Sequence, residues 1–375
     1  MARSDILNQG TIMTARPHVL VVGAGIVGAS IAYHLQRDGA AVTVIDAGEA
    51  GGIATRHSWA WINASWGNPE AYFRLRHRSM KLWRELGATV PGLAVNWCGG
   101  LLWDVPAAEL AAYVTQHRAW GYDIRAVTRE EAQRIEPHLA TPPEAAVHVP
   151  EEGSVEPVAA AQVLLAAARA LGAEILAGRN VAAIETQVGR AVAVVTGQGR
   201  VDADEVVIAA GTGTPDLLAP LGVQLPLSAP PGLLVVTDPQ PKLLNGLAMA
   251  PQMHIRQQPD GRLIAGADFG GGDLPKDATP AVAEAAAREL VAAMGDFFTP
   301  HRRFGLDHFT LGYRPTPADG FPAVGRAPGI DGLSIAVTHS GITLAPAIGA
   351  SVAGAILGKL DEPLLTPYRL ERFAA

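Results

Sequence analysis

The sequence contains a single cysteine, Cys98, among its 375 residues. One thiol cannot form a disulfide within the chain, and it excludes zinc sites and iron–sulfur clusters that are built from several cysteines. Charged residues are also scarce, at 17% of the chain, and its 29 Lys and Arg residues do not gather in runs. Without a basic block to neutralise phosphates, we expect no nucleic-acid partner. A reducing, cytoplasmic location is expected, and no metal site.

The chain also lacks a long run of large apolar residues. Its first sixteen residues mix charged and polar side chains, so they lack the apolar core of a signal peptide and are expected to form a loose extension. Residues 341–358 carry no charge and approach the ~20 residues that a membrane helix needs. They consist mainly of Gly, Ala, Ser, Thr and Pro rather than Leu and Phe. We therefore expect a helix buried in the core and no integral membrane span.

Hydrophobic residues make up 49% of the sequence, which is enough for a large packed core. At ~150 residues per domain, the length indicates two domains. One pattern occurs three times: a short apolar strand runs into a glycine turn that leads to a helix. The strands are His18–Val22, residues 206–210 and Leu333–Val337. Because the first copy continues to a second strand at Ala41–Ile45, it predicts a parallel βαβ unit.

The intervening segments have a different pattern. Residues 97–105, 233–238, 253–258 and 262–268 are strand-like, and Pro-Asp-Gly at 259–261 predicts a hairpin between the last two. Thr128 and Glu131 form a capping box for a short helix. We therefore predict two domains, a discontinuous parallel-sheet domain and an inserted, antiparallel-rich domain. The first comprises residues 17–93, 151–225 and 309–375, and the second comprises residues 94–150 and 226–308.

The first glycine turn has the spacing of a dinucleotide-binding turn. Gly23 permits a sharp turn, Gly25 lets a pyrophosphate approach the backbone, and Gly28 lets the helix pack closely on the sheet. Asp46 ends the next strand, where a carboxylate can accept hydrogen bonds from both ribose hydroxyls. A glycine turn without a ligand is the alternative. The pattern predicts dinucleotide binding but does not distinguish FAD from NAD.

Six motifs follow in order along the chain: VVGAGIVGAS at 21–30, GSVEP at 153–157, DEVVIAAGTGT at 204–214, DGRLIAG at 260–266, LGYRPTPADGFPAVG at 311–325 and THSGITLAPAIG at 338–349. With them the chain resembles the flavoprotein family of glycine oxidase, sarcosine oxidase and the D-amino-acid oxidases and dehydrogenases. The resemblance implies an α/β fold in which an FAD-binding Rossmann-like domain carries an inserted antiparallel-sheet substrate domain. It also implies non-covalent FAD, with its ADP half on the N-terminal turn and its isoalloxazine ring near the C-terminal glycine turn.

The resemblance also implies roles for individual residues. Arg314 would hold the substrate carboxylate beside the flavin, since a guanidinium fork forms two parallel hydrogen bonds; a surface ion pair is the alternative. His254 occupies a position where relatives often carry a tyrosine, and an exposed strand histidine is the alternative. Arg256, two residues further on, could be a second anion contact, although a surface role is favoured. We expect catalytic roles for Arg314, His254 and Tyr313.

Trp59, Trp61 and Asn63 alternate along the segment where the family encloses the flavin, so they would share one face of an extended chain. They could line the substrate pocket, although core packing is the alternative for each tryptophan. A helix that begins near residue 341 would direct its first N–H groups at the flavin N1/C2=O edge. The expected cofactor contacts are Gly23, Gly25, Ile26, Val27, Gly28, Asp46, Ala47, Thr55, Arg56, His57, Val181, Ala210, Gly211, His339, Ser340, Gly341, Ile342 and Thr343.

The implied function is FAD-dependent oxidation of the C–N bond of glycine, an N-substituted glycine or a D-amino acid. Hydride would pass to flavin N5, and water would hydrolyse the imine to a 2-oxo acid or glyoxylate plus an amine or ammonia. The acceptor would be oxygen or a quinone, and a homo-oligomer is possible. Three alternatives stay open: a D-amino-acid dehydrogenase with a quinone or partner acceptor, an FAD-binding subunit of a multi-chain amine or opine oxidase, and an NAD-dependent dehydrogenase.

Overall fold

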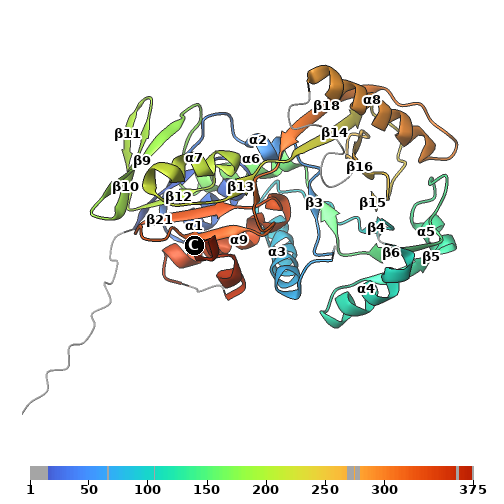
Figure 1. The fold of residues 1–375 in the computed structure, drawn as a ribbon, viewed down its shortest axis with the longest axis horizontal. Helices are drawn as coiled ribbons and strands as arrows, with labels where there is room; N and C mark the ends of the chain where they lie inside the picture. The colour runs from blue at the N-terminus through green and yellow to red at the C-terminus, as the bar shows by residue number, and fades with distance from the viewer. Residues whose placement is uncertain are drawn as a thin grey trace, which may run out of the picture.

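The computed structural model describes residues 16–65, 67–104, 106–267, 274, 279–359 and 363–373. Apart from Arg16, the expected N-terminal extension lies outside the described residues, as do residues 105 and 268 at the ends of two expected strands. Figure 1 shows two large sheets side by side, one in the left half of the molecule and one in the right half. One is mainly parallel and the other mainly antiparallel, so the predicted α/β class is confirmed.

The parallel sheet forms around the first apolar strand. β1 (His18–Val22) and β2 (Ala41–Ile45) are parallel neighbours joined by helix α1 (Ile26–Asp38), which is the expected βαβ unit. Gly39 ends α1 with a left-handed φ of 112°, a conformation that glycine adopts without strain. On the other side of β1 lie β12 (Glu205–Ile208) and β21 (Leu333–Val337), both parallel to it in order. The three strand–glycine-turn patterns therefore meet in one sheet, with their carboxyl ends at one edge.

Two further strands complete this sheet of six. Its order is β20 (Ala323–Arg326), β21, β12, β1, β2 and β8 (Glu174–Leu176), with β20 antiparallel to β21. The helices that pack beside it include α1, α3 (Glu70–Thr89), α6 (Pro157–Ala170) and α9 (Gly341–Ile356).

Helix α9 is the uncharged segment expected to be buried, and most of its side chains are buried. Small residues let it approach α1 closely. A Cβ on Gly349 would collide with the Ser30 hydroxyl and lie 2.8 Å from His34 Nδ1. None of the helices in the described part of the chain is long and apolar enough to cross a membrane.

His34 lies in this α1–α9 contact, and its burial predicts an acid-labile fold. Burial lowers the pKa of His34 from 6.5 to about 4. Between these values the unfolded chain binds a proton that the folded chain does not, so the free energy of unfolding should fall as the pH falls from 6.5 towards 4. Because one pKa unit corresponds to ~1.4 kcal/mol, the loss over this window is about 3 kcal/mol.

Urea unfolding at a series of pH values, for the wild type and His34→Gln, measures this loss directly. Buried histidines elsewhere, such as His254 and His339, contribute equally to both proteins. As the pH falls from 6.5 to 4, the free energy of unfolding of the wild type should decrease by about 3 kcal/mol more than that of the variant. Parallel curves for the two proteins would show that His34 does not carry the effect.

The second large sheet has eight strands and contains the predicted hairpin. β16 (His254–Gln257) pairs antiparallel with β17 (Leu263–Gly266) around the Pro-Asp-Gly turn. The expected strand over 97–105 is limited to β4 (Gly100–Leu102). The order is β18 (Leu306–Tyr313), β14 (Pro231–Thr237), β17, β16, β15 (Leu247–Met249), β4, β6 (Ala145–Val149) and β5 (Arg125–Thr128), antiparallel except for β15 beside β4.

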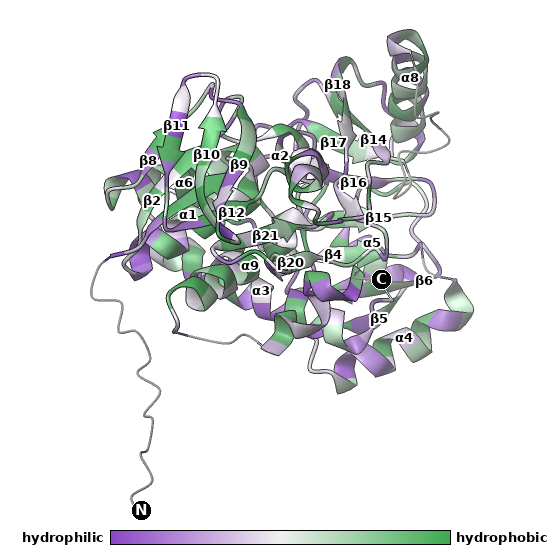
Figure 2. Cartoon of the chain, turned by 60° about the vertical axis from the view of Figure 1, so that its left-hand side comes forward, coloured by the Kyte–Doolittle hydropathy of each residue, from purple (hydrophilic) through white to green (hydrophobic). Residues whose placement is uncertain are grey.

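Helices α4 (Ala107–Ala119), α5 (Arg129–Ile135) and α8 (Pro280–Asp296) lie around this sheet. The predicted capping box is present at α5, where the Thr128 hydroxyl and Glu131 carboxylate each accept the other residue's backbone N–H. Figure 2 shows purple and green alternating along α4, in agreement with a helix that buries one face only. The mixed sheet and its helices thus form a second core.

The remaining elements of the described chain are short. They are α2 (Ile53–Arg56), β3 (Trp61–Ile62), β7 (Gly153–Ser154), the three-stranded sheet of β9 (Val181–Gln187), β10 (Arg190–Thr196) and β11 (Gly199–Asp202), α7 (Thr214–Leu218), β13 (Leu227–Ser228) and β19 (Thr316–Pro317), together with 3₁₀ turns at Gly211–Gly213, Ala219–Leu221, Pro363–Tyr368 and Leu370–Phe373. The division into two domains remains a proposal. Because β18 pairs with β14 along its whole length, we propose that the inserted domain extends to residue 313 rather than 308.

Candidate functional site

A cavity of about 1130 Å³ lies where the two sheets face each other. One wall is formed by the carboxyl ends of β1, β12 and β21, the edge at which parallel α/β sheets bind ligands. The other wall is the face of the mixed sheet, with Gly232, His254 and Gly312 among its lining residues. The cavity is as large as the sites that hold small ligands and cofactors, which are ~300–1,000 Å³.

The first glycine turn leaves backbone donors free at this cavity. Gly25 precedes α1 in an extended conformation, with φ −68° and ψ 176°, and no side chain caps the helix. The Ile26 N–H donates to Thr55 Oγ1 at 3.0 Å, whereas the N–H groups of Gly25 and Val27 have no partner among the described residues. Gly28 does not line the cavity; a Cβ there would collide with the Gly23 carbonyl. The turn can therefore bind an anion. Gly28 instead allows α1 to pack closely against the turn at Gly23.

Asp46 is held beside the same turn. Its Oδ2 accepts the Ala24 N–H at 2.6 Å and its Oδ1 accepts the Gly48 N–H at 2.7 Å. The carboxylate lines the cavity and keeps further lone pairs for a ligand's hydroxyl groups. Its position is that of a ribose-binding acid in a dinucleotide site.

The second glycine turn, like the first, leaves backbone N–H groups free at the cavity. Helix α9 begins at Gly341 after Ser340, whose side chain does not cap it. Leu344 is the first residue whose N–H bonds back, to Ser340 O at 3.0 Å. In the described chain, the N–H groups of residues 341–343 have no partner, and all three residues line the cavity. The positive end of the α9 dipole therefore faces the cavity.

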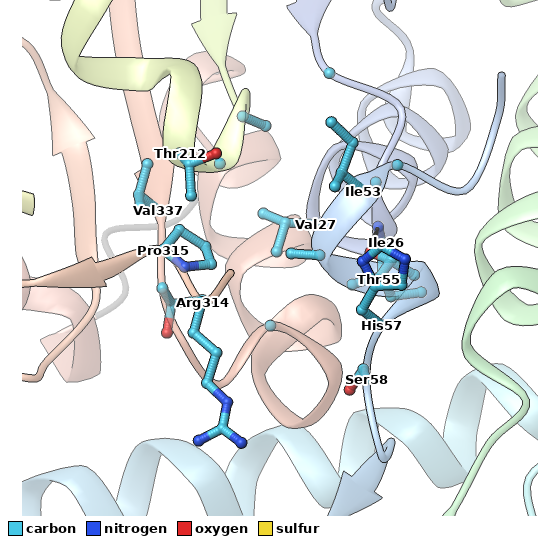
Figure 3. A pocket seen from close by; sticks show the side chains of 18 of the residues that line it. Ile26, Val27, Ile53, Thr55, His57, Ser58, Thr212, Arg314, Pro315 and Val337 are labelled. Carbon is cyan, nitrogen blue, oxygen red and sulfur yellow. Dashed lines mark hydrogen bonds between the residues drawn. The ribbon is translucent and has the colours of Figure 1, made fainter. Parts of the chain in front are cut away.

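Arg314 extends into the cavity from the chain after β18. Figure 3 shows its guanidinium in the open space, with Ile26, Thr55 and His57 on the opposite side. The guanidinium lies over Gly232, where an added Cβ would be 3.2 Å from Nη2. Burial lowers the pKa of Arg314, and no carboxylate of the described residues pairs with it. It is thus a cation placed to receive an anion from outside the protein.

An aromatic wall lies near Arg314, formed by Trp59, Trp61 and His254, which all line the cavity. The His254 ring contacts Trp59 edge to face, with centroids 4.7 Å apart, and Trp59 contacts Trp61 at 5.8 Å. His254 is only 6% exposed, so the alternative of an exposed histidine is wrong. Burial lowers the pKa of His254 to about 3, which keeps the imidazole neutral. Behind the wall, Trp61 Nε1 donates to the buried Glu152 at 2.8 Å.

Arg256, which was considered as a second anion contact, lies outside this cavity. Its side chain is 3% exposed. Its Nε donates to Trp59 O at 2.7 Å and its Nη1 pairs with Glu156 at 2.8 Å. Glu156 is 100 residues away in sequence, so the strand pattern alone could not reveal this pair. Arg256 holds the Trp59 segment in place through these contacts, and the surface role that the sequence favoured is wrong, because the residue is buried.

The other expected contacts all line the cavity, including Tyr313, which is 41% exposed. Two buried atoms among them, His57 Nδ1 and Asn63 Oδ1, have no hydrogen-bond partner within the described ranges. Buried polar atoms are nearly always paired in proteins. A polar ligand in the cavity is therefore the expected partner of both.

Among the lining residues that were not expected from the sequence, one carries a buried charge. Arg76 lies on α3, is 7% exposed and lines the cavity. Tyr72, Phe73, Met80 and Trp83 are buried on the same helix. At helical spacing Arg76 falls on this apolar face. A charged residue on an otherwise apolar helix face was the sequence feature that could have indicated its role.

Gly266 makes room for the aromatic wall, and filling that room should destabilise the protein. A Cβ on Gly266 would collide with the His254 ring and lie 2.9 Å from Leu234 Cδ2. Gly266→Ala should therefore lower the free energy of unfolding by ~1–3 kcal/mol, the usual effect of overpacking. Urea denaturation measures it, and His254→Ala supplies the matched background. If Gly266→Ala lowers the free energy of unfolding as much in the His254→Ala background as in the wild type, the clash with His254 is not the cause.

Comparisons with known proteins agree with this geometry. The chain is 28% identical over 371 residues to glycine oxidase from Bacillus licheniformis, covering 97% of this chain and 98% of that protein. The solved L-proline dehydrogenase from P. horikoshii is similar with a TM-score of 0.86 at 26% identity, covering 96% of this chain and 98% of that one. The iminodiacetate oxidase from Chelativorans sp. BNC1 gives a TM-score of 0.79 at 26% identity, covering 94% and 98%.

A family model described as FAD dependent oxidoreductase matches residues 18–355. This match includes both glycine turns and every cavity residue discussed above. The resemblance seen in the sequence and the FAD cofactor it implied are thereby confirmed. The protein belongs to the DAO family of FAD-dependent oxidoreductases.

Proposed function

We propose that the protein oxidises the C–N bond of a small amino acid, with Arg314 binding the substrate carboxylate. The relatives named above are called after glycine, L-proline and iminodiacetate. These compounds share an amine nitrogen and a carboxylate on one carbon. The observation that carries the proposal is the guanidinium of Arg314, which faces the cavity and forms no ion pair with the described carboxylates.

The cavity residues fit FAD. The free N–H groups at Gly25 and Val27 suit the pyrophosphate, and Asp46 suits the ribose. The unpaired N–H groups of residues 341–343 suit the carbonyl edge of the ring. When bound, FAD supplies the two-electron acceptor, which takes a hydride from the α-carbon.

The residues of the chain position and shield the substrate. Arg314 fixes the carboxylate, which orients the α-carbon towards the ring. His254 is neutral, so it neither repels Arg314 nor competes with it for the carboxylate. The Trp59 and Trp61 rings exclude water around the reacting carbon. Tyr313, at the exposed rim, remains a proposed contact.

No dedicated base is proposed for this reaction. If the amine binds unprotonated, hydride departure leaves an iminium ion that water converts to a 2-oxo acid, or to glyoxylate, plus an amine or ammonia. His254 is too acidic when protonated to serve as a base near neutral pH, since its pKa is about 3. Oxygen or a quinone is the proposed final acceptor, and glycine, N-substituted glycines and D-amino acids are the proposed substrates.

An anaerobic screen tests the function. The purified protein is mixed with glycine, sarcosine, other N-alkylglycines, proline, iminodiacetate and both enantiomers of common amino acids, and loss of flavin absorbance is recorded. At least one compound should bleach the flavin, and descarboxy amines of the same size should not. Bleaching by the amines but by none of the acids would contradict the role of a carboxylate. Reoxidation by oxygen or by a quinone then identifies the acceptor.

A further inference from the structure

Arg76 is a buried cation that forms no ion pair with a described carboxylate, although its charge acts on the buried Glu152, where it partly offsets the rise in pKa that burial causes. Its Nε donates to Asn63 O at 3.1 Å, and its Nη1 donates to Ser340 Oγ at 2.8 Å and Tyr72 OH at 3.4 Å. All three acceptors are neutral. No described carboxylate forms an ion pair with Arg76, and its Nη2 has no hydrogen-bond partner in the described chain.

Such an arrangement is unfavourable unless an opposite charge lies close to the guanidinium. A guanidinium cannot lose its proton in a protein, and an unpaired buried charge costs several kcal/mol. The buried Arg256 shows the usual solution, because Glu156 pairs with it. Arg76 instead lines the cavity. Its charge is therefore available to balance a negative charge on whatever occupies the cavity.

The hydrogen bond to Ser340 shows where this charge lies. Ser340 is the residue before α9, and the next three residues have free N–H groups at the cavity. The guanidinium and the positive end of the helix dipole thus act at the same place. The neighbouring His339 adds no charge. Burial, followed by the nearby Arg76 and Arg314, lowers its pKa to about 4.

The buried Arg76 and the half-buried Arg314 both line this cavity, and neither forms an ion pair with a carboxylate of the described residues. In the proposed function the substrate carboxylate pairs with Arg314. A hydride carries two electrons and one proton from the α-carbon to the ring. The neutral amine becomes an iminium cation, and the neutral oxidised ring gains one negative charge. This second negative charge appears only on reduction, and no charged side chain assigned so far pairs with it.

We propose that Arg76 is the cation that stabilises the negatively charged reduced ring of FAD, acting together with the start of α9. The proposal rests on the proposed function, which places the ring at that helix. Arg76 thereby makes reduction of the ring more favourable and is a catalytic residue. Ser340 is a positioning residue, because its hydroxyl holds Nη1 at this place.

The test compares Arg76→Gln and Arg76→Lys with Arg74→Gln as the control. Arg74 lies on the same helix, is 45% exposed and pairs with Glu70. FAD content is measured first, and then the two-electron midpoint potential by dithionite titration against a reference dye, which needs no amino-acid substrate. Arg76→Gln should make reduction about tenfold to hundredfold less favourable, lowering the potential by about 30–60 mV. Arg76→Lys should restore part of the loss, and the control should not change.

A second readout follows the charge itself. The absorbance of the fully reduced protein is recorded against pH, because the neutral and anionic reduced rings absorb differently. Arg76→Gln should raise the pKa of the reduced ring, whereas Arg74→Gln should not. An effect confined to protein stability would leave this pKa unchanged in the folded fraction.

The outcomes separate this inference from the proposed function. If Arg76→Gln binds FAD normally and neither the potential nor the ring pKa changes, the inference is wrong. Weaker binding of a competing carboxylate with no change in potential would assign Arg76 to the substrate instead, and would also overturn it. If Arg76→Gln does not fold, Ser340→Ala is used, and a smaller shift in the same direction is expected. Failure of every amino acid to bleach the wild type would defeat the proposed function alone.

Discussion

Arg314→Ala is expected to retain bound FAD and to lose nearly all flavin reduction by amino acids. The guanidinium lies in the cavity wall opposite the first glycine turn, so its removal leaves the proposed pyrophosphate contacts in place. A charged hydrogen bond contributes ~1.5–3 kcal/mol, and two parallel bonds are lost. The ratio of the reduction rate constant to the dissociation constant should therefore fall by roughly 10²–10⁴-fold.

Anaerobic stopped-flow absorbance measures this ratio. Arg314→Lys keeps the charge but not the fork, so it should lie between the wild type and the alanine variant. Arg303→Ala, an exposed arginine outside the cavity, serves as the matched control. Reduction kinetics in Arg314→Ala equal to those of the control would show that another group binds the carboxylate.

Gly25→Val is expected to give a folded, colourless protein. A Cβ at Gly25 would be 3.3 Å from Thr55 Oγ1 and 4.0 Å from Gly52 Cα, and the backbone there, at φ −68°, suits any residue. The fold can therefore accommodate the change after a small adjustment of Thr55. The isopropyl group, however, occupies the space that the pyrophosphate needs beside the free N–H groups.

FAD released by heat denaturation and the circular dichroism spectrum provide the two measurements. Bound FAD should fall to about one-tenth of the wild-type content or less, since the loss of one charged hydrogen bond to the phosphates alone costs ~1.5–3 kcal/mol. Gly197→Val is the control, because Gly197 lies in the β10–β11 turn with nothing within 4 Å of an added Cβ. A fully yellow Gly25→Val protein would refute the placement of the phosphates.

The sequence predicted those features whose causes are local. A run such as His18–Val22, followed by glycine and a helical repeat, can form little other than strand, turn and helix. The burial of α9 followed in the same way from its composition. The roles of Arg314 and His254 were predicted from the family resemblance, and both residues line one cavity in the structure.

Features set by distant partners were not predictable in this way. Arg256 forms an ion pair with Glu156, 100 residues away in the sequence, and does not line the cavity. Arg76 donates to Ser340, 264 residues away, and does line it. The pairing of β18 with β14, on which our proposed extension of the inserted domain to residue 313 rests, likewise joins segments far apart in the sequence. Each case depends on a contact that no local pattern encodes.

The central claim is that a carboxylate binds between Arg314 and the FAD ring. A crystal structure with FAD and a carboxylate that cannot be oxidised, such as acetate, tests it most directly. Two parallel hydrogen bonds from Arg314 to the carboxylate are predicted, with the ring between this pair and the start of α9. A carboxylate bound elsewhere in the cavity, with Arg314 paired to a protein acid, would contradict the account.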